Sequence, residues 1–279
     1  MSSIKIVFTD LDGTLLSSTK QISRANIDCL CKLGRQNVIR VISTGRSLFS
    51  FNKLFDQQLP VDYLIFSTGS GIVDLNTHKL LFSSSLEAED IHFIASYLMK
   101  HTVDFMVHQP VPDNHYFSFF MGQKNNPDFT RRIKIYRDYG DQFTVLTSLP
   151  EKSAQIIAIF PNDPDRFELI KKGLTRYTIT RTTSPLDGQS IWMEITPAAV
   201  SKGNSAKWLC SHLHFDSINS LGIGNDYNDV SLLDFTRASY MVANGPKELQ
   251  NRYLSTLSND DDGFCHAVYD AKVLLACRT

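Results

Sequence analysis

Two aspartates, Asp10 and Asp12, stand two residues apart directly after an apolar run near the start of the chain. The run, residues 4–8, has the composition of a strand buried on both faces, as in a parallel sheet. Because side chains at i and i+2 of an extended chain point the same way, both carboxylates project from the carboxyl end of that strand. Open α/β sheets bind ligands at this edge. Two carboxylates so close repel each other, so the pair is expected to hold a cation or share a proton.

The stretch around this pair, FTDLDGTL at residues 8–15, resembles motif I of the haloacid dehalogenase (HAD) superfamily. The resemblance implies that Asp10 is a nucleophile that becomes an aspartyl phosphate. It also implies that Asp12 acts as general acid and base, and that the backbone carbonyl of Asp12 binds Mg²⁺.

The same chemistry suits the residues themselves. A carboxylate can attack phosphorus and split one transfer into two easier steps. Because its charge opposes an anionic phosphate, a metal and a cationic side chain are needed. Hard oxygen ligands favour Mg²⁺, which leaves positions for water and phosphate. A second carboxyl can protonate the leaving oxygen and later activate water.

A second candidate segment, VISTGR at residues 41–46, ends the next predicted strand. It resembles motif II in the form typical of the Cof-like branch, which implies that the Thr44 hydroxyl binds phosphate. Gly45 lets backbone N–H groups approach an anion closely. We predict that Thr44, Gly45 and Arg46 form part of a phosphate site.

A third segment, SKG at residues 201–203, places Lys202 at a helix amino terminus, where a cation gains nothing from the helix dipole. A bound anion shared between the ammonium group and the helix terminus explains this position better. The segment, with Glu194 and Pro197 before it, resembles motif III, so Lys202 is a predicted catalytic and phosphate-binding residue.

A fourth segment, GIGNDYND at residues 222–229, resembles motif IV, whose usual form is G-D-x-x-N-D with the first Asp ligating Mg²⁺. Here Asn225 stands in place of that Asp. Either Asn225 ligates the metal with Asp229 in support, or the loop shifts so that Asp226 ligates. Asn228 matches the position that contacts phosphate.

The elements that position these motifs alternate between strand and helix in the first and last thirds of the chain. Such alternation predicts a parallel sheet with helices on both faces. The middle has a different, α+β pattern. We therefore predict an α/β protein. Because the middle section lies between motifs II and III, the family resemblance implies a Rossmann-like, HAD-type core at residues 1–82 and 187–279, and an inserted C2-type cap at residues 83–186.

The predicted cap would read the leaving group of the substrate. A cap that closes over the site excludes water during the first transfer. Six polar side chains of the insertion are candidate readers, namely His108, His115, Tyr116, Arg131, Arg132 and Arg137.

Composition limits the class of protein. The 279 residues carry a net charge of −1, and 42% are hydrophobic, which predicts neither a nucleic-acid nor a membrane partner. The five cysteines, at positions 29, 31, 210, 265 and 277, show no metal-binding spacing and are expected to be reduced thiols of a cytoplasmic protein. The oligomeric state stays open.

The motifs occur in order and predict a Mg²⁺-dependent phosphomonoester hydrolase acting on a small phosphorylated metabolite, such as a sugar phosphate. A phosphomutase is the alternative, because phosphomannomutases with C2-type caps resemble the same core. A non-catalytic sensor of phosphorylated metabolites is a third hypothesis, which Asn225 alone favours.

Overall fold

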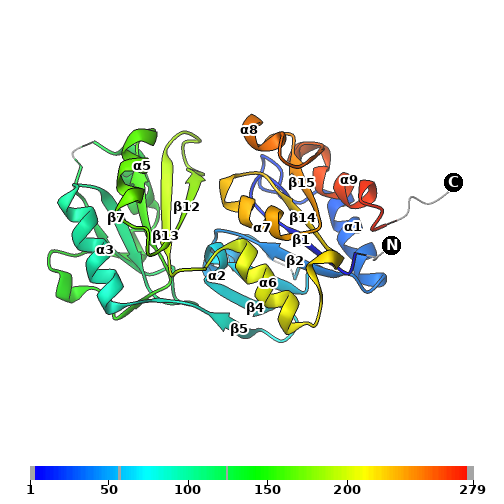
Figure 1. Ribbon diagram of the computed structural model, residues 1–279, viewed down its shortest axis with the longest axis horizontal. Coiled ribbons are helices and arrows are strands. Elements are labelled where there is room, and N and C mark those ends of the chain that lie inside the picture. The colour runs from blue at the N-terminus through cyan, green and yellow to red at the C-terminus, as the bar shows by residue number, and fades with distance from the viewer. Residues whose placement is uncertain (1–3, 56–57, 124, 275–279) are drawn as a thin grey trace. The chain divides into compact units, whose positions relative to one another are not determined.

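The computed structural model describes residues 4–55, 58–123 and 125–274. The chain divides into two compact units (Figure 1). The first unit contains the described parts of residues 1–45, 55–82 and 201–279. The second unit contains residues 46–54 and the described parts of residues 83–200.

The first unit is built on an eight-stranded sheet, as counted over the described residues, in the order β16-β15-β14-β1-β2-β3-β4-β5. The strands from β16 to β3 pair in parallel, and β4 pairs antiparallel with β3. This mostly parallel sheet agrees with the predicted α/β class. Their bounds are β1 Ile6–Thr9, β2 Ile39–Ser43, β3 Tyr63–Phe66, β4 Gly71–Asp74, β5 Lys79–Ser83, β14 Ser220–Gly224, β15 Ala238–Val242 and β16 Leu254–Thr256.

Helices cover both faces of this sheet (Figure 1). Helices α6 and α7 pack on the face that carries Ile6 and Phe8 of β1. Helices α1 and α9 contact each other, and they reach β2, β14 and β15. Burying both faces explains why β1 is buried along its whole length and apolar at every position except Thr9. The helices are α1 Arg24–Arg35, α6 Lys202–His212, α7 Val230–Phe235, α8 Lys247–Gln250 and α9 Gly263–Asp270.

Among its described residues, the second unit has a six-stranded sheet in the order β12-β13-β11-β7-β8-β9, antiparallel except where β8 meets β9. Strands β6 and β10 form a separate short antiparallel pair that contacts α3 (Ala88–Lys100). The strands are β6 Leu86–Glu87, β7 Asp104–His108, β8 Phe117–Phe120, β9 Gly140–Gln142, β10 Lys152–Ser153, β11 Ile156–Phe160, β12 Thr178–Thr183 and β13 Ile191–Thr196.

Two apolar clusters hold this second sheet. Helices α3 and α5 bury residues such as Ile94 and Phe167 against Phe105 of β7. In the second cluster, Phe129 of α4 packs with Met106 and Trp192. The helices of this unit are α2 Leu48–Asn52, α3 Ala88–Lys100, α4 Pro127–Ile135 and α5 Pro164–Lys172.

The division between the units differs from the expected boundary at residue 187. Strand β13 pairs with β11 and β12, so residues 187–200 group with the second unit. Residues 46–54, which include α2, group with it too. Strand β13, Ile191–Thr196, lies beyond the expected boundary, but its sheet partners lie in the inserted segment.

Candidate active site

Three of the predicted motifs meet at one edge of the first sheet. Asp10 follows the last residue of β1, Thr44 follows β2, and Asn225 follows β14. These three strands are adjacent and parallel, so their carboxyl ends coincide. The backbone N–H of Asp10 donates to the carbonyl of Ile223 at 2.9 Å, which fixes the start of the motif I loop.

Lys202 joins two aspartates in a buried ion-pair network. Its Nζ lies 2.7 Å from Oδ1 of Asp10 and 2.6 Å from Oδ1 of Asp229. The side chains of Lys202 and Asp229 are fully buried, and that of Asp10 is 6% exposed. Ser201 caps α6 by accepting from the N–H of Asn204. The helix start thereby sets the Lys202 ammonium between the carboxylates.

Burial and neighbouring charge alter the acidity of this group. Burial, followed by the Asp229 carboxylate, raises the pKa of the Asp10 carboxyl to about 7, and the Lys202 ammonium opposes both. Burial alone would lower the pKa of Lys202, but Asp10 and Asp229 outweigh it and hold that pKa above its ordinary value. The Lys202 ammonium is therefore charged at neutral pH.

Asp229 organises the motif IV loop. Its Oδ2 accepts from the backbone N–H groups of Asn225 at 2.8 Å and Asp226 at 3.1 Å. Asp226 in turn caps the 3₁₀ turn η5 (Tyr227–Asp229), its Oδ1 accepting from the N–H of Tyr227 at 2.8 Å. Because Lys202 holds Oδ1, both oxygens of Asp229 have partners within the protein. Asn228 lies in the same turn.

The side-chain amide of Asn225 lies against the motif I loop. One of its two polar atoms is 3.1 Å from Oδ2 of Asp10 and 3.2 Å from the backbone oxygen of Asp12. As nitrogen, this atom donates to both oxygens. With the amide turned over, the Asn225 side-chain oxygen lies 3.1 Å from Oδ2 of Asp10 and 3.2 Å from the Asp12 carbonyl oxygen.

Those three oxygens fit a hard cation. In an octahedral Mg²⁺ shell with bonds of about 2.0–2.1 Å, neighbouring oxygens lie about 3.0 Å apart. The separations of 3.1 and 3.2 Å are close to that value. Across residues 4–55, 58–123 and 125–274, no three His, Cys, Asp or Glu side chains are grouped to hold a metal ion. Of the predicted metal residues, the structure thus brings together Asp10, the Asp12 carbonyl and Asn225.

The Asp12 carboxyl is more open than that of Asp10. Its side chain is 28% exposed, and its Oδ1 lies 3.2 Å from Nζ of Lys20. An accessible carboxyl can exchange protons with solvent, as an acid and base must. Lys20 was not among the residues predicted from the sequence, because nothing in its local pattern separates it from a surface lysine.

The motif II residues divide between the two units. Thr44 is buried, its N–H donates to the Ile65 carbonyl at 2.9 Å, and its carbonyl accepts from Thr68 at 3.1 Å. Gly45 ends the segment that groups with the first unit. Arg46 groups with the second unit, where its Nη1 donates to Oγ of Ser50 at 3.3 Å.

The six predicted cap readers have different environments. The half-buried Arg132 guanidinium lies 4.7 Å from the centroid of the Trp192 ring and 4.9 Å from that of the Tyr136 ring. Arg131 donates to the Leu186 carbonyl at 2.9 Å. Arg137 and Tyr116 are exposed, His108 is buried, and His115 stacks on a ring of α2.

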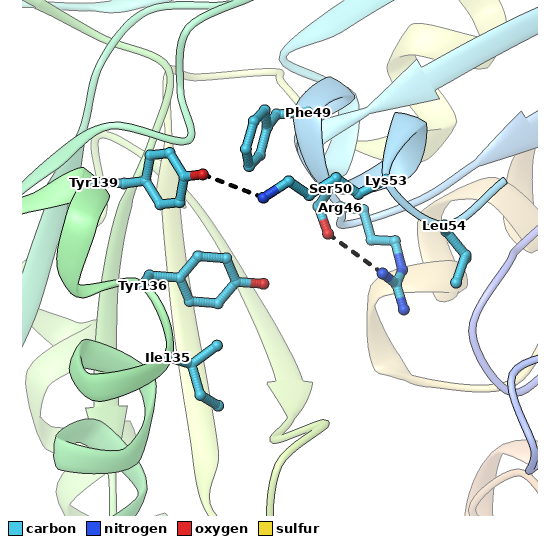
Figure 2. A pocket seen from close by; sticks show the side chains of 8 residues that line it. All are labelled: Arg46, Phe49, Ser50, Lys53, Leu54, Ile135, Tyr136 and Tyr139. Carbon is cyan, nitrogen blue, oxygen red and sulfur yellow. Dashed lines mark hydrogen bonds between the residues drawn. The ribbon is translucent and has the colours of Figure 1, made fainter. Parts of the chain in front are cut away.

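That ring, Phe49, belongs to a pocket that the sequence reasoning missed. It is lined by Arg46, Phe49, Ser50, Lys53, Leu54, Ile135, Tyr136 and Tyr139, all within the second unit (Figure 2). One signal could have revealed it: positions 46, 49, 50 and 53 have the spacing of one helix face directly after motif II.

Comparisons with known proteins agree with this fold. The profile of the haloacid dehalogenase-like hydrolases matches residues 7–268. The chain is 24% identical over 286 residues to 5-amino-6-(5-phospho-D-ribitylamino)uracil phosphatase YwtE of Bacillus subtilis, covering 95% of this chain and 97% of the relative. BT1666 of Bacteroides thetaiotaomicron, a HAD phosphatase, shares the fold with a TM-score of 0.82 at 18% identity, over 98% of this chain and 97% of that one. The HAD subclass IIB sugar phosphatase BT4131 gives a TM-score of 0.78 at 17% identity, over 97% and 100%.

The parallel sheet with an acidic pair and a lysine at its carboxyl edge defines a HAD-type enzyme. The chain belongs to the haloacid dehalogenase-like hydrolase family, and the comparisons support a phosphatase. The expected fold class and enzyme class are confirmed. Among the helices of the described residues, none has the length and apolar character needed to cross a membrane.

Proposed function

We propose that this protein is a Mg²⁺-dependent phosphomonoester hydrolase that forms an aspartyl phosphate on Asp10 and acts on a small phosphorylated metabolite. One observation carries the proposal: the two oxygens of Asp10 have different partners. Oδ1 pairs with Lys202 at 2.7 Å, and Oδ2 faces the Asn225 amide, which also faces the Asp12 carbonyl. The Asp10 carboxylate thus has a cationic side chain beside one oxygen and oxygen ligands for a metal ion beside the other. Both would offset the negative charge of a phosphate that approaches it.

In the first step, a carboxylate oxygen of Asp10 attacks phosphorus and the bond from phosphorus to the leaving oxygen breaks. The Asp12 carboxyl gives its proton to the leaving oxygen. In the second step, water attacks phosphorus, its proton passes to Asp12, and the bond from phosphorus to Asp10 breaks. Asp10 is regenerated and inorganic phosphate leaves.

The remaining residues position the phosphate. The Thr44 hydroxyl, the N–H groups around Gly45, and the Arg46, Lys202 and Asn228 side chains would bind its oxygens. Mg²⁺, bound by Asp10, the Asp12 carbonyl and Asn225, would supply charge neutralisation for the phosphate oxygens. Asp229 supports Lys202 and the loop, and Asp226 caps the η5 turn. These contacts favour Asn225 over Asp226 as the ligand.

The two units would divide the work. The first unit carries the nucleophile and the proposed metal ligands, so we assign catalysis to it. The second unit is assigned the role of a C2-type cap that selects the leaving group, a sugar or another small metabolite. A cytoplasmic location fits the free thiols at Cys29, Cys31, Cys210 and Cys265, whereas Cys277 lies outside the described residues.

A screen for phosphate release tests the proposal. The purified protein would be incubated with a panel of phosphorylated metabolites and acetyl phosphate, with Mg²⁺ or with EDTA. Phosphate release that needs Mg²⁺ and is lost in Asp10→Asn is the expected result. Conversion of a sugar phosphate to its isomer without free phosphate would show a phosphomutase instead. Binding without turnover of any ester would show a sensor.

A further inference from the structure

The second unit contains a pocket for which the proposed function gives no role. Of the residues that line it, only Arg46 belongs to the proposed phosphate site. It has a volume of about 280 Å³. Five lining residues come from the segment 46–54, and three come from the end of α4 and the turn that follows (Figure 2). In Figure 2 the Tyr136 and Tyr139 rings project toward the side chains of α2.

Covalent connection ties this pocket to the proposed phosphate site. Arg46 follows Thr44 with only Gly45 between them. Two residues of extended chain span at most about 7 Å. Arg46 itself lines the pocket, so a molecule whose phosphate is bound by the Arg46 guanidinium has its leaving group beside the pocket lining.

The rings of the pocket are held in place before any ligand binds. Phe49 stacks on His115 with centroids 4.1 Å apart and planes within 8°. Tyr139 meets Phe49 edge-on at 5.0 Å. Lys53 Nζ lies 4.2 Å from the Phe49 centroid and donates to the Tyr139 hydroxyl at 3.1 Å. A rigid aromatic wall of this kind loses little side-chain entropy on binding.

The lining offers many hydrogen-bond donors and few acceptors. Arg46 and Lys53 can only donate, and none of the eight side chains is a carboxylate or carboxamide. The only side-chain acceptors are the hydroxyl oxygens of Ser50, Tyr136 and Tyr139. A polyol can accept from Arg46 and Lys53, but each of its hydroxyl protons also needs an acceptor, and the lining side chains supply only those three hydroxyl oxygens. A flat ring that presents acceptor atoms or negative charge is well matched.

We propose that this pocket binds the leaving group of the substrate, and that the leaving group is a planar, acceptor-rich heteroaromatic ring. The inference rests on the proposed phosphatase function and narrows its substrate class. The rings of Phe49, Tyr136 and Tyr139 provide the aromatic surface. The Lys53 ammonium donates a hydrogen bond to an acceptor atom of this ring.

Two probes of similar size test the class: pyridoxine 5′-phosphate, which has a flat pyridine ring, and glucose 6-phosphate, which is a polyol. Acetyl phosphate serves as the minimal ester. We expect a kcat/KM at least tenfold higher for pyridoxine 5′-phosphate than for glucose 6-phosphate. In Lys53→Met and Tyr136→Leu, kcat/KM for pyridoxine 5′-phosphate falls at least tenfold further than that for acetyl phosphate.

The matched control is Lys134→Met, which removes an exposed cation of α4 that does not line the pocket and should keep the wild-type ratio. Binding of pyridoxine itself, followed by its fluorescence in the Asp10→Asn protein, gives a readout that needs no turnover. Equal or better use of glucose 6-phosphate, or no pyridoxine binding, overturns the inference. So does an equal loss on all three esters. Absence of phosphate release from acetyl phosphate by the wild type, with pyridoxine still bound, refutes the proposed function instead.

Discussion

The side-chain amide of Asn225 lies 3.1 Å from Oδ2 of Asp10, at the position where the motif usually has an aspartate. In the absence of a cation the amide nitrogen can donate to Oδ2 and to the Asp12 carbonyl. An aspartate at 225 would instead place a second carboxylate against Asp10. The amide therefore gives the Asp10 carboxylate a hydrogen bond when no metal is bound. In return, the metal site has one negative charge fewer to attract Mg²⁺.

We predict that Asn225→Asp binds Mg²⁺ more tightly, by about tenfold, because ligand charge raises affinity for a hard cation. Calorimetric titration of the phosphate-free protein would measure this. The same variant should unfold at a lower temperature than the wild type in EDTA, and Mg²⁺ should restore more of its stability. Asn228→Asp adds the same charge in the neighbouring turn and is the control. Mg²⁺ binding that is equal or weaker in Asn225→Asp would contradict the assignment.

Lys202→Met should abolish turnover and destabilise the fold. It leaves Asp10 and Asp229 buried beside each other without their shared cation. Breaking a buried ion pair by removing one partner typically costs about 3–5 kcal/mol. Urea denaturation would measure the free energy of unfolding. Adding Asp229→Asn to Lys202→Met should recover part of the stability and none of the activity; no recovery would argue that Lys202 acts mainly through packing.

Asp10→Asn should reduce phosphate release to the background level while leaving the fold intact, because the amide keeps the shape of the side chain but is no nucleophile. Circular dichroism and thermal unfolding would check the fold. More than a few per cent of wild-type turnover in the pure variant would remove Asp10 from the nucleophile role. A trapped phosphate or beryllofluoride adduct should lie on Asp10.

The loss of turnover in Asp12→Asn should depend on the leaving group of the substrate. General acids contribute roughly 10²–10⁴-fold, and most where the leaving oxygen is basic. Release of an alkyl alcohol should therefore suffer more than release of nitrophenolate. Parallel kinetic measurements on an alkyl phosphate and on nitrophenyl phosphate would compare the two. Equal losses on both esters would count against proton donation by Asp12.

The sequence was sufficient to place the site residues at the strand ends, because their positions follow from the local pattern of apolar and polar residues. Asp10 and Thr44 each come directly after an apolar strand, and adjacent parallel strands align their ends. The choice between Asn225 and Asp226 could not be made from the sequence. It depends on the path of the loop, which is set when Asp229 accepts from the two backbone N–H groups.

The domain boundary and the aromatic pocket depend on long-range pairing. The strand at residues 191–195 has the same apolar pattern whichever sheet it joins, so its pairing with β11 could not be predicted. Phe49 and Tyr139 are 90 residues apart, and α2 has only five residues, too few for a clear periodic signal. Their contact emerges only when α4 and its following turn are in place.

His108 should make the second unit less stable in mild acid. It is buried, and its Nδ1 lies 2.8 Å from the Asn114 carbonyl. Burial, with the Arg132 charge adding to it, lowers the pKa of His108 to about 3, against the raising effect of that carbonyl. In the unfolded chain the pKa is about 6.5. Below pH 6.5 His108 binds a proton in the unfolded state but not in the native state. The free energy of unfolding therefore falls as pH drops from about 6.5 toward 3.

The expected slope for this single group approaches about 1.4 kcal/mol per pH unit. His108→Asn keeps an N–H near the Nδ1 position and removes the titration, so its free energy of unfolding should change less between pH 6 and pH 5. The protein has two tryptophans, and a Trp208→Phe background leaves Trp192 to report urea unfolding of the second unit. His78→Asn, at an exposed turn, is the matched control. Parallel stability curves for wild type and His108→Asn over this range would show that His108 takes up its proton in the folded protein.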